Sequence, residues 1–137
     1  MTIEISDRVL ETLEWDIIKD KLVSLCGTEP GKDLCGLMSP LDPEAIRKQL
    51  KKTTELKELF NKNITINFSG INDINPFIIL SEKEGTLKIE ELVAVKKFII
   101  GSHQVYNFLS ENNEELHYLK EEKTEMEFSP DIRDEKN

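Results

Sequence analysis

The chain has 137 residues, of which 38% are hydrophobic and 33% are charged, so it can form one domain with a modest core. Its formal net charge of −9 argues against polyanionic partners, although residues 111–137 alone contribute −6, through ten acidic and four basic side chains. No apolar run reaches the ~18 residues that a membrane-spanning helix needs, so a membrane protein is excluded.

The start of the chain lacks the basic segment and apolar stretch of a secretory signal. Cys26 and Cys35 are too few for a disulfide scaffold, and we expect reduced thiols. Together these features predict a cytoplasmic protein.

Helical signals dominate the first third of the chain. Ser6 can cap a helix that runs toward Gly27, either unbroken or as two short helices separated near Glu14-Trp15. Thr28 can cap a further short helix that ends before Ser39-Pro40. These signals predict an irregular set of helices in this part of the chain.

The clearest helix start is Asp42-Pro43, because aspartate accepts the unpaired N–H groups and proline fits the first turn. The helix is expected to end at about Asn61. Its apolar stripe consists of Ile46, Leu50, Thr53, Leu56, Leu59 and Phe60.

The second half of the chain starts with an alternating segment, residues 63–70, that can be a short strand or an extended connector. A short helix over residues 73–83 follows, with Pro76 in its first turn and Glu84-Gly85 at its end. A long helix is expected from about Ile89 to Glu111, and a weak one around residues 116–119.

These elements predict an all-α, irregular multi-helix fold of about five to six helices with at most one short strand-like segment. We expect one helical domain over residues 1–122 and an acidic, disordered tail over residues 123–137.

The segment from Gly27 to Asp33 is similar to a phosphate-binding loop but fails its chemistry. Only three residues separate its glycines, Pro30 has no N–H to donate, and Asp33 replaces the hydroxyl that would bind magnesium. We therefore interpret this segment as a corner between two helices.

Metal and nucleophilic chemistry find equally little support. The residues that could form a zinc set are Cys26, Cys35, His103 and His117, but no pair has the short spacing of such sites. We interpret them as core thiols and surface histidines. The sequence predicts no catalytic, cofactor-binding or metal site.

One basic cluster could contact phosphate groups. Arg47, Lys48, Lys51 and Lys52 fall on one face of the expected helix, opposite its apolar stripe. The same pattern is typical of an ordinary solvated face, and no aromatic residue that could stack on bases lies nearby in the sequence.

Three blocks of the sequence, taken together, resemble the MutS family. The resemblance is strongest to the family's bacterial second-paralogue branch. The first block is Leu10-Glu11-Thr12-Leu13-Glu14-Trp15-Asp16-Ile17-Ile18 leading to Thr28-Glu29-Pro30-Gly31-Lys32. The second is Leu37-Met38-Ser39-Pro40-Leu41-Asp42 running into Ile46 and Leu50. The third is Gly70-Ile71-Asn72-Asp73-Ile74 with Glu84-Gly85-Thr86-Leu87 and Glu90-Glu91-Leu92. The resemblance covers about residues 10–109 and implies the N-terminal part of the family's helical core domain.

That resemblance implies a dimeric parent protein, a DNA-binding ATPase that recognises branched DNA in repair and recombination, with an endonuclease tail in some members. ATP and magnesium would bind only in downstream parts, so no such residue is carried over to this chain. The expected partners are the remainder of the MutS-like protein or its homodimer partner, and DNA through the parent. A helical core cut off here should also leave apolar surface exposed on the Ile89–Glu111 helix.

Three hypotheses follow from the sequence. The first is a non-catalytic core segment of a MutS-like protein. The second is a free-standing acidic helical module that docks on a partner protein. The third and weakest is direct DNA binding through Arg47, Lys48, Lys51 and Lys52.

Overall fold

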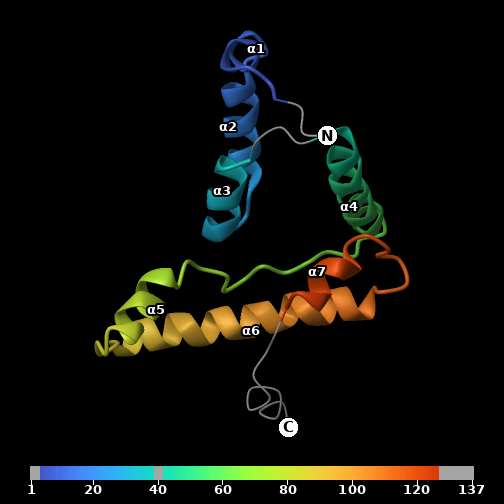
Figure 1. The fold of residues 1–137 in the computed structure, drawn as a ribbon. Coiled ribbons are helices and arrows are strands. Elements are labelled where there is room, and N and C mark those ends of the chain that lie inside the picture. The colour runs from blue at the N-terminus through green and yellow to red at the C-terminus, as the bar shows by residue number, and fades with distance from the viewer. Residues whose placement is uncertain (1–3, 39–41, 127–137) are drawn as a thin grey trace.

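The computed structural model describes residues 4–38 and 42–126 (Figure 1). This part of the chain contains helices and no strand, which confirms the all-α prediction. The helices are α1 (Asp7–Thr12), α2 (Trp15–Leu25), α3 (Glu29–Gly36), α4 (Pro43–Asn61), α5 (Asn75–Glu82), α6 (Ile89–Glu111) and α7 (Lys120–Thr124).

Local signals in the sequence explain most helix boundaries. Glu14 adopts a left-handed conformation (φ 54°) and separates α1 from α2, so the alternative with two helices is the right one. The Thr28 hydroxyl accepts a hydrogen bond from the N–H of Gly31 at 3.1 Å at the start of α3. At the start of α4, the Asp42 carboxylate accepts from the N–H groups of Glu44 and Ala45, each at 3.1 Å.

The segment between α4 and α5 is an extended connector rather than a strand. Gly70 (φ 86°) lets it approach α6 so closely that an added Cβ would lie 2.7 Å from the carbonyl oxygen of Lys97. A Cβ on Gly101 of α6 would likewise lie 2.6 Å from the carbonyl oxygen of Ser69. The connector therefore packs directly along a helix, as Figure 1 shows, and has no neighbouring strand to pair with.

The core lies where the C-terminal ends of α4 and α6 meet the turns that follow α6. Leu59 of α4 and Leu116 are fully buried, and Phe108 and Leu109 of α6 pack with them. The apolar stripe of α4 contributes mainly through its C-terminal half, because Ile46 and Leu50 remain 41% and 59% exposed.

The weak helix expected around residues 116–119 is absent, and α7 begins only at Lys120. Residues 117–119 form a turn because the Glu55 carboxylate accepts hydrogen bonds from the N–H groups of Tyr118 and Leu119. Helix α7 spans the expected domain boundary at residue 122, while residues 127–137 of the expected tail lie outside the described residues.

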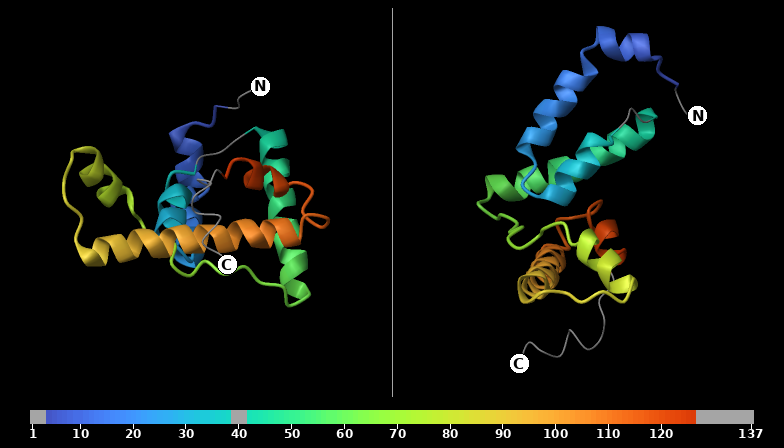
Figure 2. Two further views of the ribbon diagram at one scale, coloured as in Figure 1. Left: turned by 90° about the horizontal axis from the view of Figure 1, so that it is seen from below. Right: turned by 90° about the vertical axis from the view of Figure 1, so that its left-hand side faces the viewer.

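Helices α1–α3 form a hairpin-like unit that lies apart from α5–α7 in Figure 1 and in the right-hand view of Figure 2. None of the described residues in these three helices is buried. Apolar side chains are exposed along the unit, among them Leu13 (61%), Ile17 (64%) and Leu25 (75%). The unit therefore lacks a covering partner within this structure.

Helix α6 has two different halves. Its C-terminal half carries core residues, whereas Ile89 and Leu92 in its first turns are 78% and 52% exposed. The expected exposed apolar surface on this helix is confirmed for the N-terminal half.

No described helix combines the length and apolar character that crossing a bilayer requires. The proline-containing corner at residues 39–41, one of the blocks that resemble the MutS family, lies outside the described residues.

Candidate nucleic-acid interface

The four basic residues singled out in the sequence lie on α4, and we call them the basic face. Arg47, Lys48, Lys51 and Lys52 occupy positions i, i+1, i+4 and i+5, so successive pairs are one helical turn apart. The structure thus brings these cations together as the spacing requires.

A segment from the other end of the chain covers part of the basic face. This segment, residues 115–122, is called the strap. Glu121 forms an ion pair with Lys48 at 2.9 Å, Glu122 pairs with Lys52, and Glu115 pairs with Lys62 at 3.1 Å. The Lys52 side chain is only 12% exposed, whereas Lys48 and Glu121 are each 50% exposed. Two cations of the basic face are therefore already engaged with carboxylates.

Glu55 and Leu116 hold the first part of the strap on α4. The buried Glu55 carboxylate accepts from the N–H of Tyr118 at 2.8 Å and from the N–H of Leu119 at 3.0 Å. Leu116 fills the core beside Leu59. These contacts fix the backbone of residues 116–119 independently of the Glu121 and Glu122 ion pairs.

Tyr118 is the aromatic residue that the sequence did not place near the basic face. The Lys51 ammonium donates a hydrogen bond to the Tyr118 hydroxyl at 3.0 Å and lies 5.0 Å from the centre of its ring. The two residues are 67 positions apart, so no local sequence pattern predicts their contact. Only the fold brings a stacking side chain to these cations.

Three residues of the basic face and Tyr118 border an open hollow of about 500 Å³. Its lining residues are Asp42, Glu44, Ala45, Arg47, Lys48, Lys51 and Tyr118. Asp42 turns its carboxylate to the N-terminus of α4, where it accepts backbone N–H bonds. The hollow thus has three cations and a tyrosine, with carboxylates on the side nearest the start of the helix.

Electrostatics strengthen the contact between Lys48 and Glu121. The hydrogen bond and charge of Lys48 lower the pKa of Glu121 below its usual 4.5, and the charges of Lys52 and Lys120 act in the same direction. The hydrogen bond and charge of Glu121 raise the pKa of Lys48 above its usual 10.5. Both residues are therefore charged at neutral pH.

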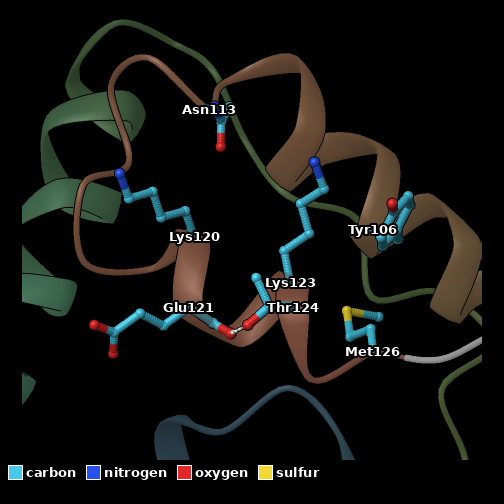
Figure 3. Close-up of a pocket in the computed structure, with 7 residues that line it drawn as sticks. All are labelled: Tyr106, Asn113, Lys120, Glu121, Lys123, Thr124 and Met126. Carbon is cyan, nitrogen blue, oxygen red and sulfur yellow. Dashed lines mark hydrogen bonds between the residues drawn. The ribbon is translucent and has the colours of Figure 1, made fainter.

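A second hollow, of about 400 Å³, lies on the other side of α7 (Figure 3). It is lined by Tyr106, Asn113, Lys120, Glu121, Lys123, Thr124 and Met126. The Lys123 ammonium lies 5.3 Å from the centre of the Tyr106 ring, and the Thr124 hydroxyl donates to the carbonyl oxygen of Glu121 at 2.7 Å. In Figure 3 the Glu121 carboxylate points away from the side chains of Tyr106 and Met126; it pairs with Lys48 of α4.

The segment from Gly27 to Asp33 is a helix corner, as its chemistry predicts. The Gly31 N–H is engaged by Thr28, and the Lys32 ammonium donates to the Glu29 carboxylate at 3.4 Å. Neither the backbone nor the lysine is arranged around a phosphate.

The cysteines and histidines do not assemble as a zinc set would. Among the described residues, no group of three or more potential ligands lies within reach of one ion. Burial, with a hydrogen bond to the Cys26 thiol, raises the pKa of the Cys35 thiol. His117 is exposed, but His103 is buried in α6, so the prediction of surface histidines is wrong for His103, which falls on the core side of that helix.

Comparison with known proteins finds several relatives that share the name endonuclease MutS2. The chain is 28% identical over 128 residues to endonuclease MutS2 of Streptococcus thermophilus, an alignment that covers 92% of this chain and 16% of the relative. It is 32% identical over 113 residues to endonuclease MutS2 of Staphylococcus haemolyticus, covering 80% of this chain and 14% of the relative. The protein of the same name from Lachnoclostridium phytofermentans is 30% identical over 114 residues, covering 80% and 14%.

The chain therefore spans 14–16% of the length of these curated relatives. No protein-family model matches it. No solved structure matches it either.

Proposed function

This chain is related in sequence to the MutS2 proteins of the MutS family, and we propose that it serves as the non-catalytic N-terminal core segment of a MutS-like protein. The observation that carries the proposal is the alignment of 92% of this chain with 16% of a much longer relative. On this proposal the parent protein acts in DNA repair and recombination in the cytoplasm and recognises branched DNA as a dimer. ATP and magnesium bind in its downstream parts.

The exposed apolar surfaces support this role. The hairpin-like unit α1–α3 has no buried residue among those described, and the first turns of α6 are exposed as well. A helix with an apolar face gains most of its stability by covering that face. Downstream core helices of the same protein, or its homodimer partner, supply such a cover.

The arrangement also suits a segment that transmits movement. Helix α4 leads from the α1–α3 unit to the core around Leu59, and the strap ties it to the chain that leaves α6. On this proposal, α4 and the strap help to transmit movement between parts of the parent protein. The segment itself performs no chemistry.

Two measurements test the proposal. The purified chain should hydrolyse no ATP above background in the presence of magnesium, and it should form a stoichiometric complex with a MutS2 relative lacking the aligned N-terminal portion. Hydrolysis by the isolated chain, or failure to bind the truncated relative under conditions where both are folded, would contradict the proposal.

The alternative is a free-standing module that docks on a partner through the same apolar surfaces. The two roles differ in the source reading frame. A frame that continues past residue 137 into a phosphate-loop sequence favours the core segment, whereas a stop codon there favours the module.

A further inference from the structure

We propose that the basic face of α4 and Tyr118 form a binding surface for single-stranded nucleic acid, and that Glu121 and Glu122 of the strap close it. All residues that form the surface lie within this chain. It requires neither an ATPase nor the parent protein.

The cations are spaced for a run of phosphate groups. Lys48 and Lys52 lie four residues apart, about 6 Å along the axis, and Arg47 and Lys51 form a second such pair beside them. A flexible single strand can adapt its phosphates to these two rows, since its backbone is not constrained by a duplex. Attraction between these cations and a chain of phosphates weakens as the salt concentration rises. The salt dependence of the binding affinity therefore reports how many cations take part.

Tyr118 supplies the second part of a single-strand site. Its ring stands next to the Lys51 ammonium at the edge of the 500 Å³ hollow. Bases stack on such rings with little regard to sequence, and a stacking ring beside cations is the usual composition of single-strand grooves. Duplex DNA keeps its bases inside and could use only the cations.

The strap places carboxylates where phosphates would bind. Glu121 contacts Lys48 and Glu122 contacts Lys52, so an incoming strand must compete with both. Both carboxylates are about half exposed, at 50% and 46%, and are open to such exchange. Two further carboxylates, of Asp42 and Glu44, line the same hollow.

Opening the surface does not require Tyr118 to leave. Its backbone is held by the buried Glu55, and Leu116 is fixed in the core two residues earlier. Only α7, which carries Glu121 and Glu122, has to swing away from α4. The ring therefore stays in position while the cations become free.

The test uses fluorescence anisotropy with a labelled 20-nucleotide oligothymidine at low salt and at rising salt concentrations. The double variant Glu121→Gln/Glu122→Gln should bind the oligonucleotide about tenfold more tightly than the unsubstituted 137-residue chain does. Its plot of log affinity against log salt should be steeper by about 1.4, since each freed cation contributes about 0.7 on a single strand. The matched control Glu90→Gln/Glu114→Gln removes the same charge from exposed positions elsewhere and should change affinity far less.

Four further variants test whether Tyr118 and the basic face form the binding surface. Tyr118→Ala should weaken binding by the Glu121→Gln/Glu122→Gln chain about tenfold, whereas Tyr118→Phe, which keeps the ring, should bind nearly as well. Lys48→Gln/Lys52→Gln should abolish the gain, whereas Lys96→Gln/Lys97→Gln on α6 should not. Circular dichroism confirms that each variant is helical before it is compared.

Several outcomes would overturn the proposal. Equal gains for the two glutamate double variants would reduce the effect to net charge. Equal affinity for a 20-base-pair duplex, or equal competition by poly-glutamate of the same charge, would rule out single-strand recognition. Unchanged binding by Tyr118→Ala would remove the ring from the site.

Discussion

Glu55 is a buried carboxylate of α4 that joins this helix to the turn at residues 117–119. It is 9% exposed, and its two oxygens accept the N–H groups of Tyr118 and Leu119 rather than pairing with a lysine. These N–H groups would otherwise lie unpaired at the start of α7, where a negative charge is also favoured by the helix dipole. A single side chain of α4 thus determines where α7 begins.

Glu55→Ala should lower the free energy of unfolding by about 1.5–3 kcal/mol, the range for hydrogen bonds to a charged group. Urea denaturation followed by circular dichroism measures the loss. Glu58→Ala, an exposed glutamate on the same helix, is the control and should change stability little. Equal effects of the two substitutions would show that the Glu55 hydrogen bonds do not hold the strap.

The Lys48–Glu121 pair should make strap docking depend on pH. The pKa of Glu121 is lowered, so its contribution is fully present above 4.5 and is lost as the pH falls through the lower folded-state value. The pKa of Lys48 is raised, so its contribution is present below 10.5 and is lost only at still higher pH. The facing groups Lys52 and Lys120 support the charged form of Glu121, and Glu122 supports that of Lys48.

A carbon-13 NMR titration of the Glu121 carboxyl group should give a midpoint below 4.5 that moves upward in Lys48→Gln. Lys57→Gln removes the same charge from an exposed position on α4 and should leave the midpoint nearly unchanged. A midpoint insensitive to Lys48→Gln would contradict the ion pair in solution.

At the scale of elements, the extended connector and α6 depend on two glycines that let backbones touch. Gly70 faces Lys97, and Gly101 faces Ser69 and Ile71, at distances that leave no room for a side chain. The alternating pattern of residues 63–70 is compatible with a strand, but a strand needs a neighbour to pair its N–H groups. Packing against a helix is therefore what these residues do instead.

Gly101→Ala should destabilise the chain by about 1–3 kcal/mol, because the added Cβ would meet the Ser69 oxygen at 2.6 Å and the Ile71 Cδ1 at 2.9 Å. Gly36→Ala is the matched control, since nothing lies within 4 Å of its added Cβ. It should be neutral or stabilising by up to ~1 kcal/mol. Thermal unfolding of both variants measures the difference, and a tolerated Gly101→Ala would contradict the close approach.

On the scale of the whole molecule, burial is concentrated at one end. The described buried apolar residues all lie around Leu59 and Leu116, whereas α1–α3 and the first turns of α6 expose apolar side chains. Such surfaces associate in water because covering them removes apolar area from solvent.

The isolated chain should therefore associate as its concentration rises, as sedimentation velocity can measure. Leu13→Gln/Ile17→Gln in the α1–α3 unit and Ile89→Gln/Leu92→Gln in α6 should each reduce association. Glu11→Gln/Glu90→Gln, which changes exposed polar positions on the same elements, should not. A strictly monomeric chain over a hundredfold concentration range would contradict this expectation.

The sequence by itself determined the elements that depend on neighbouring residues. Thr28 and Asp42 cap the helices they were expected to cap, and the long helix runs from Ile89 to Glu111 as its periodicity indicates. Capping and helical spacing act within a few residues, so the pattern contains all the information they need. The corner between two helices at residues 27–28 follows from the same local signals.

Only the tertiary structure decided what the basic face touches. Glu55 and Tyr118 are 63 residues apart, and Lys51 and Tyr118 are 67, so their contacts depend on how the chain returns after α6. The same return of the chain replaced the expected helix around residues 116–119 by a turn and buried Leu116. Contacts of this kind are specified by the packing of whole elements. In the sequence, the four cations of α4 are compatible with an ordinary solvated face. In the folded chain, Tyr118 lies beside them and the carboxylates of Glu121 and Glu122 cover two of them.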